Sequence, residues 1–332
     1  MTINSKFIDQ FINVTSRAAL ASSYLVGKKD KNAADQAAVD SMRFELDQIK
    51  MTGNVVIGEG SLDEAPMLYT GEVLGSKIGP NFDIAVDPVE GTNFVANNLP
   101  GAISVIAIAE KGNLFNAPET YMDKIATCKI DKGLIDLDYP LEKNIKNLSD
   151  FKNKKMTSIT ACILDRPRHK KVIDKLKDLN VKIKLIKDGD VLGALYVSEP
   201  KYNIDIFLGI GGGPEGVLAA SALDTYGCLF QGRFIFDNEK DINTAKELGI
   251  SDLNKKYDLH EIIRGDSIFC ATGITNSEIL SGIKIKGNTY TSETLITHKN
   301  SNLKEIIKKT NPILEWFLFQ VENGYKKEST KI

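Results

Sequence analysis

The run FDIAVDPVEGT at residues 82–92 constrains this chain more than any other segment. An apolar strand leads into two carboxylates three residues apart, Asp87 and Glu90, and the run ends in a hydroxyl. Pro88 fixes its own φ and is predicted to end the strand, while Gly91 supplies the backbone freedom of a tight turn. Carboxylates that converge at such a turn suit hard divalent cations, although the same pattern also fits an ordinary polar turn.

Composition indicates an ordinary globular protein of one or two domains, with 332 residues, 42% hydrophobic and 26% charged. The net charge of −2 gives no basic field for nucleic acid or an anionic membrane. No signal-peptide core and no apolar run of about 18 residues is visible, so we expect a cytoplasmic protein with no membrane partner. The four cysteines are scattered without a C-x-x-C pair, which predicts reduced thiols and neither a zinc site nor disulfides.

Hydrophobic periodicity predicts an α/β fold with an N-terminal mixed α+β part and a C-terminal alternating β/α part. In the first part we expect helices at 7–24 and 33–49 and strands at 54–57, 82–86 and 102–109. A polar stretch at 142–155 is interpreted as a linker, which gives expected domains at 1–155 and 156–332. In the second part we expect strands at 156–164, 181–186, 204–210, 267–271 and 288–296 and helices at 168–179, 191–197, 214–226 and within 237–256. Alternation of this kind predicts a parallel sheet with right-handed crossovers.

Five acidic residues fall at expected strand ends or helix starts: Asp35, Glu59, Asp87, Glu90 and Glu215. Glycines beside Glu59 and Glu215 would let backbone and ligand approach closely. Several carboxylates in one pocket repel each other unless cations neutralise them. Carboxylate oxygens are the ligands that Mg²⁺ and Mn²⁺ prefer. Taken singly, each acid also fits a solvated surface position.

Two segments are suited to anions. The loop at 209–216 (GIGGGPEG) follows an apolar strand and opens a helix, where backbone N–H groups favour phosphate, although it also fits a tight turn. It lacks the Lys-Ser/Thr ending of a Walker A loop. The basic cluster from Arg166 to Lys171 lies at another expected helix start, where positive charge opposes the helix dipole and so favours an anionic ligand, although it also fits a solvated helix start.

Two further matches to phosphatase motifs are weaker. Asp188 and Asp190 form an Asp-x-Asp pair like the nucleophile motif of haloacid-dehalogenase-type phosphatases, but it comes late in the chain and lacks a clear acidic partner motif. Cys162 and Arg168 have the C-x5-R spacing of thiol phosphatases, but Asp165 between them would oppose a thiolate.

Together, the motifs resemble the class II (bacterial) fructose-1,6-bisphosphatases of the inositol-monophosphatase-like superfamily, almost end to end. The matching segments are 30–35, 58–60 with 63–69, 87–92, 116–118 with Tyr121, 166–169, 188–190, 209–216 and 271–275. The resemblance implies a layered α/β sandwich, the sugar-phosphatase fold. It implies metal-dependent hydrolysis of the 1-phosphate of D-fructose 1,6-bisphosphate in gluconeogenesis, by a homodimer or homotetramer. The alternatives are a sedoheptulose-1,7-bisphosphatase, a broader sugar phosphatase, or a catalytically inactive sugar-phosphate-binding protein.

The resemblance also assigns residues. It implies Mn²⁺ or Mg²⁺ ligation by Asp35, Glu59, Asp87, Glu90 and Glu215. It implies substrate contacts from Glu90, Gly91, Thr92, Tyr121, Arg166, Pro167, Arg168, Asp188, Gly189, Asp190 and Gly212. The residues expected around the attacking water are Thr92, Asp63 and Lys31. The chain departs from the family at Ser61, where members often carry Glu, and from the wider superfamily at Glu90, where Asp is usual.

Overall fold

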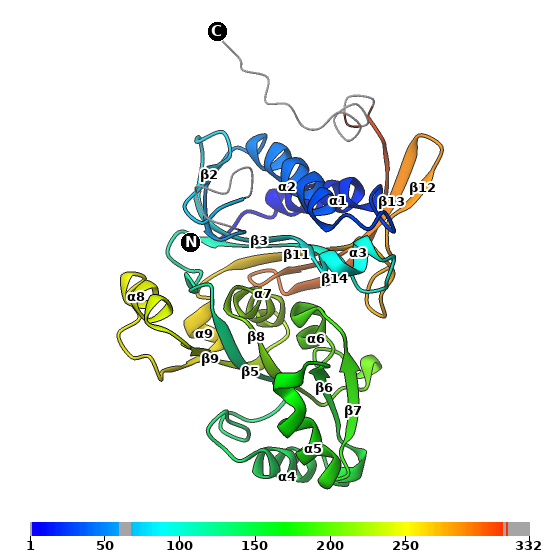
Figure 1. The fold of residues 1–332 in the computed structure, drawn as a ribbon. Coiled ribbons are helices and arrows are strands. Elements are labelled where there is room, and N and C mark those ends of the chain that lie inside the picture. Colours follow the sequence, from blue (N-terminus) through cyan, green and yellow to red (C-terminus); the bar gives the residue numbers. More distant parts are fainter. Residues whose placement is uncertain (1, 60–67, 315–316, 318–332) are drawn as a thin grey trace. The chain divides into compact units, whose positions relative to one another are not determined.

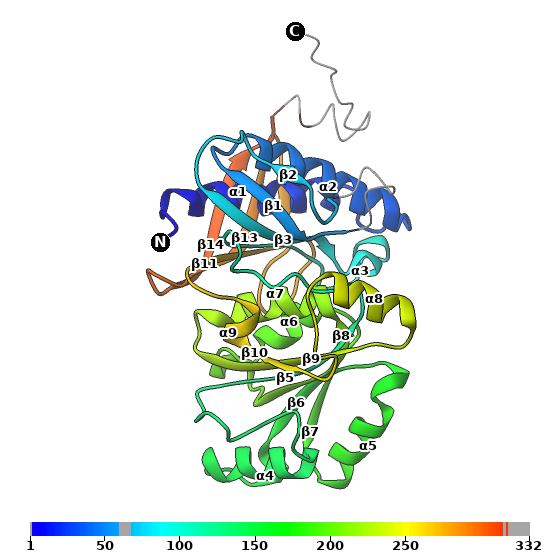
Figure 2. The ribbon, with the colours of Figure 1, turned by 90° about the vertical axis from the view of Figure 1, so that its left-hand side faces the viewer.

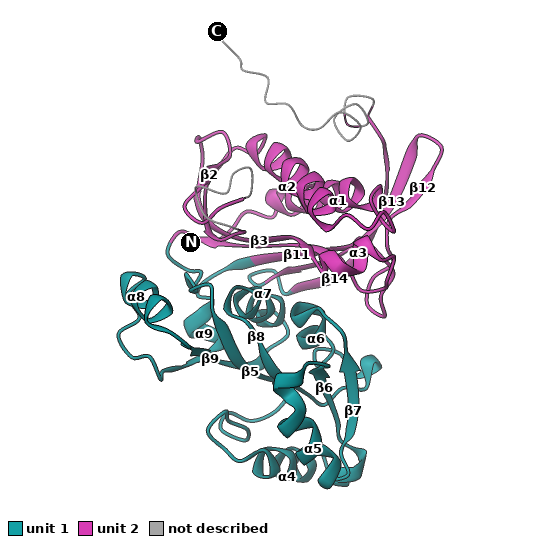
Figure 3. Ribbon diagram, in the orientation of Figure 1, with its two compact units in different colours: residues 1, 112–267, 299–302 teal, residues 2–111, 268–298, 303–332 magenta. Residues whose placement is uncertain are grey.

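The computed structural model describes residues 2–59, 68–314 and 317. The chain divides into two compact units, which are coloured separately in Figure 3. Unit 1 contains residues 112–267 and 299–302, and unit 2 contains the described residues of 2–111, 268–298 and 303–332. These divisions differ from the expected boundary near residue 155, because strands from the C-terminal third complete the sheet of unit 2.

Unit 2 is built on an eight-stranded sheet with the order β12-β13-β11-β4-β3-β1-β2, in which β14 also pairs with β13. Its strands are β1 (Thr52–Ile57), β2 (Val73–Leu74), β3 (Asn81–Glu90), β4 (Ile103–Glu110), β11 (Ser267–Gly273), β12 (Lys284–Lys286), β13 (Thr289–His298) and β14 (Leu303–Pro312). Its helices are α1 (Lys6–Ser23), α2 (Lys31–Asp47) and α3 (Thr92–Ala96). Helices α1 and α2 lie side by side over one face of the sheet (Figures 1 and 2). Phe7 of α1 packs edge-on against Phe82 of β3 with ring centroids 5.2 Å apart, which joins helix and sheet in one apolar core.

Strand β3 does not end at Pro88, so that part of the prediction is wrong. The strand continues to Glu90, and its register against β4 shifts between Asp87 and Glu90. A bulge tolerates proline because the missing N–H is not needed by the ladder there. The expected turn at Gly91 is confirmed: its φ is +88°, and it caps helix α3.

Unit 1 is built on a six-stranded sheet with the order β10-β9-β5-β8-β6-β7. Its strands are β5 (Tyr121–Cys128), β6 (Thr160–Leu164), β7 (Lys182–Ile186), β8 (Ile206–Gly212), β9 (Cys228–Ile235) and β10 (Lys256–Asp258). Its α-helices are α4 (Leu141–Phe151), α5 (Lys170–Asp178), α6 (Asp190–Leu195), α7 (Gly213–Asp224), α8 (Glu239–Glu247) and α9 (Leu259–Ile262), and its 3-10 turns are η2 (Met156–Ser158), η3 (Pro167–His169) and η4 (Pro200–Tyr202). Helices α6 and α7 cover one face of this sheet, and α4 and α5 lie on the other (Figures 1 and 2).

The α/β class is confirmed, but two local expectations for unit 1 need correction. The sheet is parallel across β7, β6 and β8 and antiparallel across β8, β5, β9 and β10, so the parallel prediction holds for one half. The stretch interpreted as a linker is largely helix α4, whose Ile145 and Leu148 are buried in the core below the sheet. Its many polar residues lie on the outer face of an amphipathic helix.

The cysteine prediction is wrong for one pair. Cys128 and Cys228 face each other across the antiparallel β5–β9 pair and form a disulfide, with Cα atoms 4.0 Å apart. They are 100 residues apart in sequence, so short-range spacing gives no sign of the pairing. Cys162 and Cys270 are free and buried. Among the helices of the described residues, none is long and apolar enough to cross a membrane.

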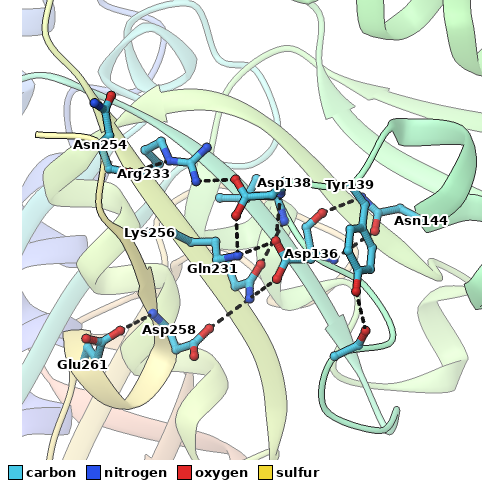
Figure 4. Close-up of polar contacts among 12 residues, drawn as sticks. Asp136, Asp138, Tyr139, Asn144, Gln231, Arg233, Asn254, Lys256, Asp258 and Glu261 are labelled. Carbon is cyan, nitrogen blue, oxygen red and sulfur yellow. Dashed lines mark hydrogen bonds and ion pairs between the residues drawn. The ribbon is translucent and has the colours of Figure 1, made fainter.

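A polar network ties the loop before α4 to strands β9 and β10 (Figure 4). Lys256 forms ion pairs with Asp136 and Asp138, and Arg233 also pairs with Asp138. Hydrogen bonds from Lys256 and Arg233 lower the pKa of Asp138 to about 2. These ion pairs therefore hold the loop before α4 against the β10 edge of the sheet.

Candidate active site

Three of the predicted metal ligands meet in unit 2. Asp35 lies in the second turn of α2, Glu59 follows β1, and Asp87 lies at the bulge of β3, where β1 and β3 run parallel as neighbours. The Glu59 side chain lies close enough to Asp35 and Asp87 for all three carboxyl groups to interact. Burial, followed by the negative charges of Asp87 and Asp35, raises the pKa of Glu59 well above its usual range. Burial also raises the pKa of Asp35. The cluster is thus negative charge held out of water and in need of neutralisation.

The chemistry of this cluster fits a divalent cation. Carboxylates that lie close together repel each other, and a cation bound to their oxygen atoms offsets that repulsion. Asp35 is 8% exposed, and its Oδ1 has no hydrogen-bond partner among the described residues. As they stand, no three acidic, histidine or cysteine side chains of the described residues form a ready-made metal cage. Glu90, 5% exposed at the end of β3, belongs to the same strand end as Asp87.

Two of the three residues predicted around the attacking water lie at helix starts of unit 2. Thr92 is the first residue of α3, directly after Gly91. Lys31 is the exposed first residue of α2, one turn before Asp35, and the helix is capped by the Asp30 side chain, which accepts from the Ala33 N–H at 2.9 Å. The predicted role of Asp63 falls outside the described residues.

In unit 1, the predicted phosphate-binding side chains are held by strand β8. The Arg168 guanidinium donates from Nε to the Ile210 carbonyl at 2.8 Å and lies 4.8 Å from the Tyr121 ring centroid. His169 fixes the same loop, because its Nδ1 donates to the Leu164 carbonyl and its Nε2 accepts from the Ile210 N–H, both at 2.7 Å. Burial lowers the pKa of His169, in keeping with this neutral tautomer. The arginine is thereby oriented before any ligand binds.

The predicted sugar-binding acids lie on the neighbouring loop between β7 and α6. Asp188 is paired with Arg166 at 3.4 Å, and Gly189 has a φ of +89° as the residue before α6. Asp190 is 6% exposed and bonds through Oδ2 to the buried amine of Lys124. The same amine donates to the Gly212 carbonyl at 2.7 Å. Lys124 of strand β5 therefore joins the start of α6, just after the β7–α6 loop, to the end of β8.

The glycine loop at 209–216 holds a carboxylate. Glu215 lies in the first turn of α7, and a Cβ atom built on Gly212 would come within 1.8 Å of its Oε2. A carboxylate at a helix N-terminus is favoured by the helix dipole. The Glu215 carboxylate therefore lies directly against the Gly212 backbone, and the loop presents Glu215 beside this predicted substrate contact. Pro167, at the first turn of η3, starts the segment that carries Arg168.

Sequence reasoning did not identify Lys124. Strand β5 was not predicted, so its lysine had no place in the fold. One feature of the sequence could have pointed to Lys124: it lies in the middle of the run YMDKIATC, which otherwise suits a buried strand. A charged residue there needs a buried partner.

The two weaker phosphatase motifs find no support. Cys162 is 0% exposed within β6, which does not suit a nucleophile. Asp188 follows β7, the edge strand of its sheet, and is paired with Arg166. Neither residue is placed for covalent catalysis.

Comparison with known proteins identifies the family. A family model described as "Bacterial fructose-1,6-bisphosphatase, glpX-encoded" matches residues 5–311. The chain is 40% identical over 319 residues to the class 2 fructose-1,6-bisphosphatase of Haemophilus influenzae, covering 92% of this chain and 96% of that protein. It is 39% identical over 317 residues to a D-fructose 1,6-bisphosphatase class 2/sedoheptulose 1,7-bisphosphatase of a Synechococcus strain, covering 88% and 91%.

Solved structures give a weaker likeness. An extragenic suppressor protein from Bartonella henselae matches with a TM-score of 0.35 and 12% identity, over 59% of this chain and 73% of that one. An inositol monophosphatase from Anabaena matches with a TM-score of 0.31 and 14% identity, over 58% and 71%. The family assignment rests on the sequence matches, and by them this chain belongs to the class 2, glpX-encoded family of bacterial fructose-1,6-bisphosphatases.

Proposed function

We propose that this protein hydrolyses the 1-phosphate of D-fructose 1,6-bisphosphate to give fructose 6-phosphate and phosphate, using divalent metal ions. The single observation that carries the proposal is the cluster of Asp35, Glu59 and Asp87, three buried or half-buried carboxyls that interact in a chain of this family. A binding protein for a sugar phosphate would need positive charge, whereas buried negative charge serves cation binding.

Asp35, Glu59, Asp87, Glu90 and Glu215 are the proposed ligands of Mn²⁺ or Mg²⁺. When bound, such ions lower the pKa of a ligated water and neutralise phosphate charge. The Thr92 hydroxyl orients the attacking water, and Lys31 and Asp63 are the proposed neighbours of that water. Asp63 or Asp35 is the proposed proton acceptor.

Residues of unit 1 make most of the proposed substrate-binding contacts. Arg168, which lies over the Tyr121 ring, and Arg166 bind the 6-phosphate, where planar guanidinium groups can form paired hydrogen bonds to phosphate oxygens. Asp188 and Asp190 accept hydrogen bonds from sugar hydroxyls. Binding energy at this non-reacting end positions the reacting end. The Gly91 and Gly212 backbones, Gly189 and Pro167 complete the proposed contacts.

A second substrate follows from the relatives. The Synechococcus relative is named for both fructose and sedoheptulose bisphosphate. Fructose 1,6-bisphosphate remains the proposed main substrate, because the family model and the Haemophilus relative carry that name alone. Cytoplasmic localisation, a role in gluconeogenesis and a homodimeric or homotetrameric state are further proposals.

Product analysis tests the proposal. Purified protein with Mn²⁺ or Mg²⁺ is incubated with fructose 1,6-bisphosphate, and the monophosphate product is identified by coupled enzymes or phosphorus NMR. We expect fructose 6-phosphate. Release of fructose 1-phosphate would contradict the assignment of the reacting end, and a higher kcat/KM for sedoheptulose 1,7-bisphosphate would make that sugar the main substrate.

A further inference from the structure

A charged amine lies fully buried inside unit 1. Lys124 is 0% exposed, in the middle of β5. Its register partners on the flanking strands are both glycines, Gly209 of β8 and Gly232 of β9. Removing an ammonium from water is costly unless its hydrogen bonds are replaced.

The contacts of Lys124 join two elements that carry proposed substrate residues. Its Nζ donates to Asp190 Oδ2 at the start of α6 and to the Gly212 carbonyl at the end of β8. The other oxygen of that carboxylate, Asp190 Oδ1, is buried and has no hydrogen-bond partner among the described residues. One side of the Asp190 carboxylate is therefore fixed while the other can still accept a hydrogen bond.

From this geometry we infer that Lys124 is a positioning residue for substrate binding. It holds the Asp190 carboxylate in place, so that Oδ1 accepts a hydrogen bond from a sugar hydroxyl, and it fixes Gly212 at the same time. This inference rests on the proposed function, in which Asp190 contacts the sugar. A buried ion pair adds little to the stability of a fold, because apolar side chains of similar volume can often replace it without loss of stability. Stability alone therefore does not explain why Lys124 is present.

The first test replaces Lys124 by methionine, which keeps the apolar stem and removes the amine. For fructose 1,6-bisphosphate, we expect KM to rise about tenfold to a hundredfold with a smaller change in kcat, because a displaced Asp190 loses its hydroxyl contact. For p-nitrophenyl phosphate, an ester without sugar hydroxyls, kcat/KM should stay within a factor of about three. A purely structural role would lower activity on both esters alike.

A matched control is Lys256→Met in the same unit. Lys256 also bridges two acceptors, Asp136 and Asp138 (Figure 4), but neither is a proposed substrate residue. We expect this variant to lose stability while its KM for fructose 1,6-bisphosphate is unchanged. A KM increase equal to that of Lys124→Met would overturn the inference.

A second variant reaches the same carboxylate without touching the lysine. A Cβ atom on Gly211 would lie 1.8 Å from Asp190 Oδ2, so Gly211→Ala must displace this carboxylate. We expect the same rise in KM and the same sparing of p-nitrophenyl phosphate. Its control is Gly232→Ala, because the nearest atoms to that Cβ all belong to the flexible side chain of Met122. If Lys124→Met does not fold, Gly211→Ala decides the question.

The outcomes separate this inference from the proposed function. A wild-type protein that releases no phosphate from fructose 1,6-bisphosphate with any metal would refute the proposed function. An active wild type whose Lys124→Met or Gly211→Ala variant folds with an unchanged KM, or loses activity equally on both esters, would refute the positioning role alone.

Discussion

Thr92 is placed by backbone geometry at the point where the reaction is proposed to occur. It follows Gly91, whose φ of +88° allows the chain to leave the β3 bulge and begin α3. If its hydroxyl orients the attacking water, Thr92→Ala should lower kcat about a hundredfold or more with KM nearly unchanged. Thr92→Ser keeps the hydroxyl and should restore most of kcat in steady-state assays. Equal kcat values for the alanine variant and the wild type would remove Thr92 from the mechanism.

Arg168 combines a planar charge with a fixed orientation. Its guanidinium lies over Tyr121 and is held by the Ile210 carbonyl. Arg168→Lys keeps the charge but loses the planar, forked guanidinium, so KM for fructose 1,6-bisphosphate should rise about tenfold. Lys170→Ala, at the 77% exposed neighbouring side chain, is the control and should leave KM unchanged. Matching KM values for both variants would exclude Arg168 from phosphate binding.

Several site residues could be predicted individually, while their partners could not. The motifs pointed to Asp35, Glu59 and Asp87, and the structure brings these three together. Lys124 was missed because its role depends on contacts with Asp190 and Gly212, which lie 66 and 88 residues further along the chain. Sequence periodicity reports local structure and carries no information on such long-range pairs.

Asp205 joins three elements of unit 1 at the start of β8. Its carboxylate accepts from Lys152 and Lys154 beyond α4 and from the Thr160 N–H at the start of β6. Burial alone would raise the pKa of Asp205, but the hydrogen bonds from Lys154, Lys152 and Thr160 outweigh it and lower the pKa. A lowered pKa means that this stabilisation is present above the unfolded value near 4 and is lost as pH falls through the folded pKa.

Asp205→Asn should therefore lower the free energy of unfolding by about 1–3 kcal/mol at neutral pH. In urea titrations, the difference from the wild type should shrink as the pH falls below about 4. Asp174→Asn, in an exposed pair with Lys170, is the control and should have little effect. A difference that stays constant down to pH 2 would show that the charge of Asp205 is not what stabilises the fold.

The disulfide between β5 and β9 is a second link between elements. It closes a loop of 100 residues, so reduction should lower the free energy of unfolding by about 2–4 kcal/mol. The Cys128→Ser/Cys228→Ser variant should not respond to reductant. A non-reducing digest of protein purified without reductant should contain the linked peptide, and its absence would contradict the bond.

The α/β class and most helices of the whole molecule could be predicted, because amphipathic periodicity is local. Strands β5, β9 and β14 could not, and without β5 and β9 the antiparallel half of the unit 1 sheet is hidden. β14 is a charged strand whose positions are all exposed or half-buried, so hydrophobic periodicity does not mark it, and it is identified only by its pairing with β13. Residues 268–298 belong to unit 2 because β11 pairs with β4, and composition gives no sign of this long-range pairing.

The most direct test of the central claim is phosphate release from fructose 1,6-bisphosphate by metal-stripped protein, measured before and after adding Mn²⁺ or Mg²⁺. We expect negligible release without metal, full activity on addition, and the same behaviour in Cys162→Ser. Activity that is independent of metal, no release with either ion, or loss of activity in Cys162→Ser alone would contradict that claim.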